Sequence, residues 1–457
     1  MECIKILAPC GILGYGFPAE SFYRGMEKKP DAIIVDAGST DAGPHKLGAG
    51  VAIVSDTAMR RDLEMMICAA AEANIPVIIG SAGGSGGRVH VEHTLEIIRG
   101  IMHSNGLEDM PTAAIWADIS KSLTAKKLGQ GCITPLGNEV PELTEQSIEN
   151  TVAIVAQMGY EPFEKALRAG FKLIVGGRAY DPSPFAAFCA YKGFPLEYGY
   201  HIGKILECAA LCAIPGTTKD CMLGTIYRDG FSVEPLSPDR KCTPLSVAAH
   251  TFYEKEHPYL LHGPGIVMNL KDCRFTQQEA GRVFVSGSRL EKPDVYTVKL
   301  EGAVPVAYRS FVLAGVRDPL MIAQIRKIEQ SAEQQVRNYY ADIYPDGDYT
   351  INFYNYGMDA VLGNAEPLKD IPHEIGLMFE VLARTQEQAN AVCASLRSTI
   401  LHYGYEGRKS TAGNLAFPFA PSDVSFGKVY AFSVYHLMEL EEEEICGLFP
   451  IERINWQ

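Results

Sequence analysis

"DAIIVDAGSTDAGP", residues 31–44, is the stretch of sequence that decides the fold class. Its apolar run, AIIV, is followed by a carboxylate and then by a loop of small polar residues. Short apolar runs bounded by turn residues are typical of strands that are buried on both faces of a sheet. The same pattern returns at residues 4–9 (IKILAP), 75–80 (IPVIIG), 112–120 (TAAIWADIS) and 171–176 (FKLIVG). We therefore expect a sheet built from these segments.

Segments with helical periodicity separate the expected strands. Residues 56–74 begin with an Asp that suits a helix N-cap, and their apolar residues recur at helical spacing. Residues 89–103 show the same spacing, and residues 144–160 predict a further capped helix. Apolar strands that alternate with helices indicate a parallel sheet with helices on both faces, which is an α/β fold.

The pattern changes beyond about residue 213. Residues 295–316 and 348–358 predict strands of a mixed or antiparallel sheet, and residues 374–407 predict a strand followed by a helix. We therefore expect two domains. The first is a parallel α/β domain over residues 1–215, and the second is an α+β domain over residues 216–457.

Composition excludes several classes of protein. Among 457 residues, 55 are Asp or Glu and 41 are Lys or Arg, for a net charge of -14, so a nucleic-acid partner is not expected. The apolar runs are far shorter than a membrane span, and the first residues lack the basic start of a signal peptide. The 12 cysteines have no framework spacing, which fits a reducing compartment. We expect a cytoplasmic protein that forms a homo-oligomer.

Polar residues follow the expected strands, and ligands of parallel sheets bind at that end of the strands. Asp36 and Asp41 flank the hydroxyls of Ser39 and Thr40, which suits acid–base chemistry or substrate orientation. The alternative is a turn in which an Asp caps the next element. Residues 10–16 (CGILGYG) form either a tight turn or a loop whose amides approach an anion.

Two further loops carry candidate binding residues. Ser81, Gly83 and Gly84 lie in a glycine-rich loop that enters a helix, where backbone amides can bind an anion; the alternative is a flexible loop. Arg178 and Asp181, three residues apart after a strand, either bind an anionic substrate or form a local ion pair. We predict that the loops around Asp36, Ser81 and Arg178 converge.

One expected helix, residues 198–216, places polar side chains on one face. His201, Lys204, Cys208 and Cys212 recur at helical spacing. Such a face can present a base and a thiolate, or bind zinc. The alternative is that the cysteines pack as apolar residues.

Taken together, these segments resemble the acyclic terpene utilisation (AtuA) family from about residue 4 to about residue 423. The resemblance is carried by LGYGFPAESFYRGM, DAIIVDAGSTDAGPHKLGAG, IIGSAGGSGG, GGRAYDPSPFAAF, HIGKILECAALCA, HPYLLHGPG and GRKSTAGNLAFPFAPSDV. It implies a role in the catabolism of acyclic terpenoids and other branched carboxylic acids or their CoA thioesters, in the context of a small companion protein. The segment DAGPHKLG departs from the family pattern, which favours a different substrate subgroup.

The motif match extends the set of candidate residues. Besides those named above, it includes Glu207, Arg408, Lys409, Thr411 and Asn414. We predict that the segment GRKSTAGN, residues 407–414, contributes cations to the site.

The resulting hypothesis is a cofactor-independent lyase or hydratase, or an isomerase, that acts on a branched carboxylate or acyl-CoA. Asp36, Asp41 or His201 would move a proton, and Arg178, Arg408 and Lys409 would hold carboxylates. No dinucleotide fingerprint, P-loop or haem motif calls for a cofactor, and a divalent metal is the alternative. Two other functions stay open: a hydrolase or acyltransferase with Cys208 or Ser81 as nucleophile, and a non-catalytic subunit of a companion protein.

Overall fold

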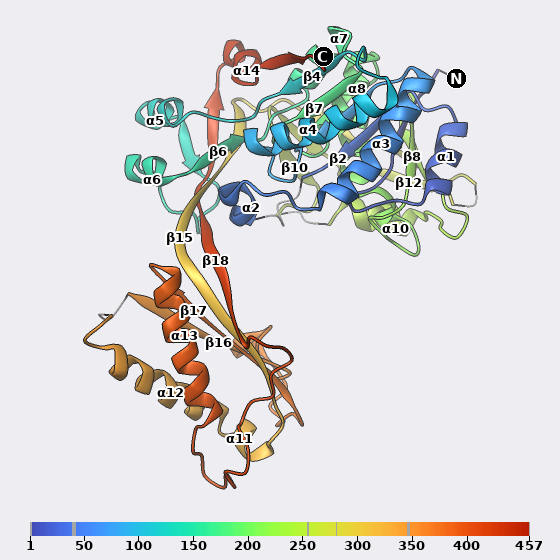
Figure 1. Ribbon diagram of the computed structural model, residues 1–457. Helices are drawn as coiled ribbons and strands as arrows, with labels where there is room; N and C mark the ends of the chain where they lie inside the picture. Colours follow the sequence, from blue (N-terminus) through green and yellow to red (C-terminus); the bar gives the residue numbers. More distant parts are fainter. Residues whose placement is uncertain (1, 39–42, 254–255, 280, 345–347, 457) are drawn as a thin grey trace. The chain divides into compact units, whose positions relative to one another are not determined.

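The computed structural model describes residues 2–38, 43–253, 256–279, 281–344 and 348–456 (Figure 1). The chain divides into two compact units, Met1–Val304 with Phe432–Gln457, and Pro305–Ala431. This division differs from the expected boundary at residue 215. The strands that follow residue 215 continue the first sheet: β8 (Met222–Ile226) pairs with β1 (Ile4–Ala8) and β9 (Phe231–Pro235) pairs with β8.

Among the described residues, the first unit is built on a ten-stranded sheet in the order β12-β13-β9-β8-β1-β2-β3-β7-β4-β19. Its outer strands are β12 (Arg274–Gln277) and β13 (Val283–Ser286) at one edge and β19 (Ile451–Ile454) at the other. Its centre consists of β1, β2 (Ala32–Asp36), β3 (Val77–Gly80), β7 (Leu173–Gly176) and β4 (Thr112–Ile115), which pair in parallel. These are the strands that the apolar runs predict, so the expected parallel sheet is confirmed. Antiparallel strands extend it on both sides, which makes the whole sheet mixed.

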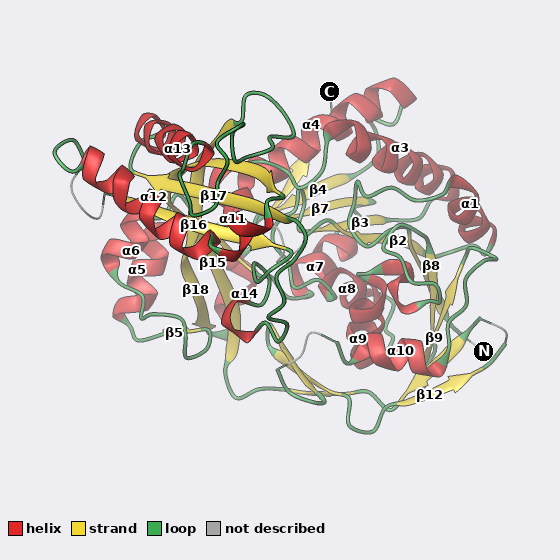
Figure 2. Cartoon of the chain, turned by 90° about the horizontal axis from the view of Figure 1, so that it is seen from below, coloured by secondary structure: helices red, strands yellow, loops and turns green. Residues whose placement is uncertain are grey.

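Helices cover both faces of this sheet (Figure 2). Ile33 and Val35 of β2 pack with α3 (Asp56–Ala73) and α4 (Arg88–Asn105), beside α1 (Ala19–Glu27). Ile34 points to the opposite face, because side chains alternate along a strand. That face is covered by α7 (Glu161–Arg168), α8 (Ser183–Tyr191) and α9 (Leu196–Leu206).

The single helix expected over residues 144–160 is wrong. The structure has a short helix, α6 (Glu145–Asn150), capped by the Thr144 side chain, and then a strand, β6 (Ala153–Ala156). This strand pairs with Leu300–Ala303 of β15 (Tyr296–Val316), so a partner far along the chain decides its conformation. Further elements of this unit are α2 (Gly43–Ala49), α5 (Lys121–Gly129), β5 (Ile133–Pro135), η2 (Ala209–Cys212), α10 (Pro244–Thr251), β10 (Leu260–Gly263), β11 (Ile266–Asn269), β12 (Arg274–Gln277), β13 (Val283–Ser286), β14 (Arg289–Glu291), α14 (Glu442–Leu448) and β19 (Ile451–Ile454).

The second unit has an antiparallel sheet backed by helices. β17 (Ile375–Ala383) pairs with β16 (Tyr349–Tyr356) and with β15 (Tyr296–Val316), and β18 (Asp423–Leu440) continues the order. The unit boundary falls inside both long strands, β15 and β18. The expected mixed or antiparallel sheet is therefore confirmed.

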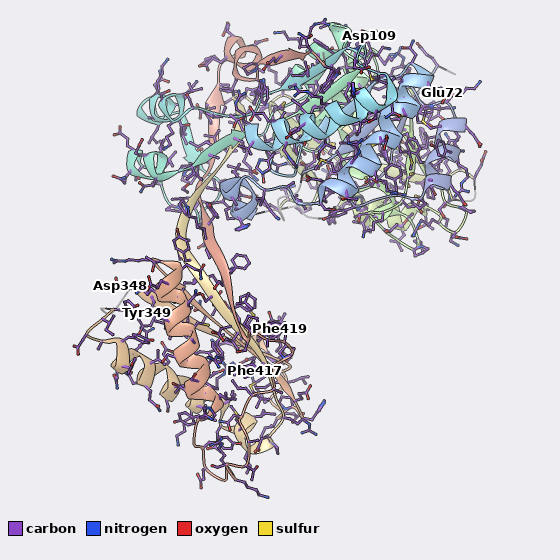
Figure 3. The ribbon with its side chains drawn as sticks, in the orientation of Figure 1. Glu72, Asp109, Asp348, Tyr349, Phe417 and Phe419 are labelled. Atoms are coloured by element: carbon purple, nitrogen blue, oxygen red, sulfur yellow. The ribbon has the colours of Figure 1, made fainter. Side chains whose placement is uncertain are left out.

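The helices of this unit are α11 (Pro319–Ala323), α12 (Ile325–Tyr340), η3 (Gly363–Ala365) and α13 (Gln386–Leu401). The predicted apolar face of α13 is buried in the core of this unit. Phe417 packs against the same core, whereas Phe419, two residues along the chain, is exposed (Figure 3). Among the residues that the structure describes, no helix combines the length and the apolar character needed to span a bilayer.

Candidate functional site

Asp36, the last residue of β2, is a buried carboxylate at the carboxyl end of the parallel sheet. It is 3% exposed, and within the described part of the chain its Oδ1 has no hydrogen-bond partner. It lies beside Gly80 of β3, where a Cβ would stand 3.2 Å from this oxygen, so glycine leaves room for the carboxylate. Burial and the negative charge of Asp181 raise the pKa of Asp36 well above its ordinary value, against the effect of Arg178.

Arg178 follows β7 and is 1% exposed. Its guanidinium pairs with Asp181 (Nη1 to Oδ1, 3.1 Å) and with Glu301 of β15 (Nε to Oε2, 3.0 Å). Nη1 also donates to the Ser81 Oγ at 3.2 Å. The structure therefore contains the local ion pair that the sequence left as an alternative to substrate binding, and it adds Glu301 as a second carboxylate.

The three predicted loops meet at this point. Ser81 is fully buried at a positive φ of 50°, and its Oγ accepts the backbone N–H of Ala179 at 3.2 Å. A Cβ on Gly38 would lie 2.4 Å from the Ser81 Cβ, so the loop after β2 touches the loop after β3. Because the Ser81 hydroxyl joins these loops, it is poorly placed to act as a nucleophile.

Gly83 and Gly84 are required by the backbone of the same loop. Their φ angles are 67° and 105°, which L side chains rarely adopt. A Cβ on Gly83 would lie 2.8 Å from the His90 Cβ, and one on Gly84 would lie 2.3 Å from Ile53. The loop is therefore tightly packed, which differs from the flexible loop considered as an alternative.

A second charged pair lies near the first. At the end of α9, Lys204 Nζ is 2.6 Å from Glu207 Oε1, and both side chains are buried. The charge of Glu207 raises the pKa of Asp36, and the charge of Asp181 raises the pKa of Lys204. The two ion pairs thus form one electrostatic cluster around Asp36.

Cys208 lies beyond the end of α9, so the predicted single helical face ends before it. Its Sγ is 3.4 Å from the hydroxyl of Tyr253, and burial and Glu207 raise the pKa of the thiol to about 12. Nucleophilic cysteines need a lowered pKa, so this environment disfavours a thiolate. Cys212 packs in the core, with its Sγ 4.0 Å from that of Cys242, as the apolar alternative predicts.

His201 has partners of its own on α9. Its Nδ1 is 2.7 Å from the Ser288 hydroxyl and its Nε2 is 3.1 Å from the Thr251 hydroxyl, while its ring contacts Phe231. The side chain is fully buried. These contacts place His201 in a polar network with the hydroxyls of Ser288 and Thr251. Within the described ranges, no group of three His, Cys, Asp or Glu residues is arranged to hold a metal ion.

Two residues that sequence reasoning missed complete the cluster. Tyr180 is next to Ala179, and its hydroxyl is buried with no hydrogen-bond partner among the described residues. Burial and the charges of Glu207 and Asp181 raise its pKa. Glu301 comes from β15 and belongs to no motif, although an acidic residue between Leu300 and Gly302 is unusual for a buried position.

The remaining predicted residues are of two kinds. Ser39, Thr40 and Asp41 fall outside the described residues. Arg408, Lys409 and Asn414 belong to the second unit. The contribution of the GRKSTAGN segment to the site of the first unit therefore stays a prediction.

A buried carboxylate and two ion pairs at the carboxyl ends of parallel strands are typical of α/β enzymes that act on small molecules. Residues 54–421 match the family model described as "Acyclic terpene utilisation family protein AtuA", and the chain belongs to this family. Membership implies a catabolic role in the utilisation of acyclic terpenes and confirms the resemblance seen in the sequence. Comparison with the curated proteins and with the solved structures gave no match.

Proposed function

We propose that the protein is a cofactor-independent lyase, most simply a hydro-lyase, or an isomerase, that acts on a branched carboxylate or its CoA thioester. The observation that carries the proposal is Asp36. A buried carboxylate with a raised pKa, and with one oxygen that has no hydrogen-bond partner among the described residues, is suited to exchange a proton with a substrate.

In the dehydration direction, Asp36 takes the proton from the carbon next to the carbonyl group, and the electron pair of that C–H bond forms the double bond. The hydroxyl group on the next carbon leaves as water after it receives a proton from a second acid, for which Asp41 is the candidate. Lys204 and Arg178 supply positive charge near the enolate-like oxygen. Isomerisation needs only the proton steps, with Asp36 returning the proton to another carbon.

We assign His201 no role in this reaction, because its ring nitrogens bond to Ser288 and Thr251. The nucleophile alternative is less favoured, because the Cys208 thiol has a raised pKa and the Ser81 hydroxyl is engaged between loops. The subunit alternative predicts an inert chain that becomes active when a small companion protein is added.

The test is exchange of solvent deuterium into the substrate, which reports proton transfer even when the full reaction is not completed. Branched carboxylic acids and their CoA thioesters are incubated with the chain in D₂O, with and without the companion protein, and followed by mass spectrometry. We expect incorporation by the native chain and by Cys208→Ser, and none by Asp36→Asn. Incorporation by Asp36→Asn at the native rate would show that another group moves the proton.

A further inference from the structure

The segment GRKSTAGN, residues 407–414, forms a loop in the second unit that is held by hydrogen bonds of its own side chains. The Arg408 guanidinium donates to Asn414 Oδ1 at 2.7 Å, to the Ala412 carbonyl at 2.9 Å and to the Ser410 hydroxyl at 3.3 Å. The Asn414 amide in turn donates to the carbonyls of Ile400 and Tyr403. Arg408 therefore holds the loop in shape and has little capacity left for a ligand.

The backbone of this loop presents donors that are not used. Gly407 and Ser410 have positive φ angles of 86° and 55°, and such a turn points successive amides in similar directions. Within the described part of the chain, the amides of residues 409–413 donate to no backbone or side-chain acceptor. Grouped amides of this kind are suited to bind the oxygens of an anion.

The loop borders a pocket of about 650 Å³ that lies entirely in the second unit. Lys409 and Arg317 line it, both are exposed, and neither forms an ion pair with a described residue. The Asp318 carboxylate also lines the pocket, but its oxygens accept from the Leu320 amide and the Tyr405 hydroxyl, both at 2.8 Å. The cations Arg317, Arg408 and Lys409 outnumber the Asp318 carboxylate, whose pKa is lowered mainly by the Tyr405 hydrogen bond and in part by the charge of Lys409. The pocket is therefore positive on a chain whose net charge is -14.

We propose that this pocket binds the phosphate group of a small organic phosphate. Lys409 and Arg317 supply the charge, the amides of residues 409–413 and the hydroxyl of Thr411 supply donors, and the volume accommodates an organic body beside the phosphate. Tyr405, Leu320 and Leu415 give that body an apolar surface. This proposal does not rest on the proton-transfer chemistry proposed for Asp36.

A phosphate of this kind has two sources, the 3′-phosphate of CoA and an unrelated phosphomonoester or free phosphate. Titration calorimetry on the full chain separates them with four probes: inorganic phosphate, AMP, CoA and 3′-dephospho-CoA. Binding of CoA with loss of binding for 3′-dephospho-CoA identifies the CoA phosphate. Binding of AMP or inorganic phosphate at least as tightly as CoA identifies a general phosphate site. No binding of any probe at millimolar concentration overturns the proposal.

Variants locate the binding. The double variant Arg317→Ala/Lys409→Ala should bind the tightest-binding probe roughly tenfold more weakly or worse, because two charge-assisted contacts are lost. Lys409→Arg should retain most of the affinity, since it keeps the charge. Lys327→Ala, which removes an exposed charge on α12 away from the pocket, is the matched control. Equal affinity of the double variant and the control also overturns the proposal, and neither readout depends on the reaction of the first unit.

Discussion

Arg178 and Glu301, 123 residues apart in the chain, form a buried ion pair in which Nε and Oε2 are 3.0 Å apart. Lys299, on the same strand as Glu301, adds a contact of 2.9 Å from its Nζ to Oε1. Burial alone would raise the pKa of Glu301, but Arg178 and Lys299 lower it to about 2. The pair fastens the loop after β7 to β15, and the same guanidinium also contacts Asp181 and Ser81.

Glu301→Gln should therefore be strongly destabilising. The change leaves the buried Arg178 with Asp181 as its remaining ion-pair partner, and breaking a buried pair from one side costs about 3–5 kcal/mol. Urea unfolding measures the free energy. Glu164→Gln, which breaks the more exposed pair with Arg168, is the control and should cost less than about 1 kcal/mol. Similar losses in both variants would contradict the structural role of Glu301.

Acid should weaken the fold through the same residue. The folded pKa of Glu301 is about 2 and the ordinary value is 4.5, so the folded state favours the charged form. Its contribution to stability is fully present above pH 4.5 and is lost as the pH falls toward 2. The free energy of unfolding of the native chain should drop more steeply across this window than that of Glu301→Gln. Parallel pH profiles would show that Glu301 does not carry the effect.

Asp36→Asn should inactivate the protein and should stabilise it increasingly as the pH rises. The pKa of Asp36 is raised in the folded state, so the stability linked to its proton is present below its ordinary pKa and is lost as the pH rises. Because Asn cannot ionise, the variant should not lose this stability. Its free energy of unfolding should therefore exceed that of the native chain by a margin that grows as the pH rises. Loss of a proton-transfer group typically lowers the rate by roughly 10²- to 10⁴-fold. Thermal melts from pH 5 to 9 measure the change in stability, and the deuterium exchange assay measures the loss of proton transfer. If the variant incorporates deuterium at the native rate, Asp36 is not the proton-transfer group.

The centre of the fold could be predicted because its signals are local. The strands that end at Asp36, Gly80 and Gly176 are uninterrupted apolar runs, and being buried on both faces they tolerate few polar residues. Residues 144–160 were predicted wrongly because β6 is set by its pairing with β15, and no local pattern reveals that partner. The same long-range pairing hides the domain boundary, since β8 and β9 rejoin the first sheet after residue 215.

The residues of the candidate site likewise include some that the sequence predicts and some that it does not. Asp36, Ser81 and Arg178 could be predicted to meet because parallel strands end at one edge of the sheet. Glu301 could not, because it reaches Arg178 from β15, outside every motif of the first half of the chain. The prediction that His201 and Cys208 share one helix face was wrong, because α9 ends at Leu206 and Cys208 lies beyond it.

Gly38→Ala should disturb the contact between the loops. A Cβ at this position would lie 2.4 Å from the Ser81 Cβ and 3.1 Å from Arg178 Nη1, and both neighbours are buried. Such overpacking typically costs about 1–3 kcal/mol, and we expect lower activity as well because Asp36 is two residues away. Gly129→Ala is the control, since its Cβ would meet nothing within 4 Å. Equal stability of the two variants, measured by urea unfolding, would mean that the loops can separate without cost.

Glu161 provides a pH-dependent feature away from the Asp36 cluster. It lines a pocket of about 760 Å³, and both its carboxylate oxygens accept from the Tyr296 hydroxyl at 3.2 Å. Gly159 makes this contact feasible, because a Cβ there would lie 2.4 Å from Glu161 Oε2. Burial raises the pKa of Glu161 to about 7, against the effect of the Tyr296 hydrogen bond.

Glu161→Gln should stabilise the protein at high pH and leave it unchanged at low pH. Because the folded pKa of about 7 exceeds the ordinary value of 4.5, the folded state binds the proton more tightly, and stability falls as the pH rises between these values. Gln keeps an acceptor for Tyr296 but carries no charge, so the variant should gain roughly 1–3 kcal/mol above pH 7 and little below pH 4.5. Urea unfolding at pH 4.5, 6 and 8 measures the difference, with Glu164→Gln on the same helix as control. A gain that is the same at all three pH values would show that the substitution acts through packing and that Glu161 does not titrate between them.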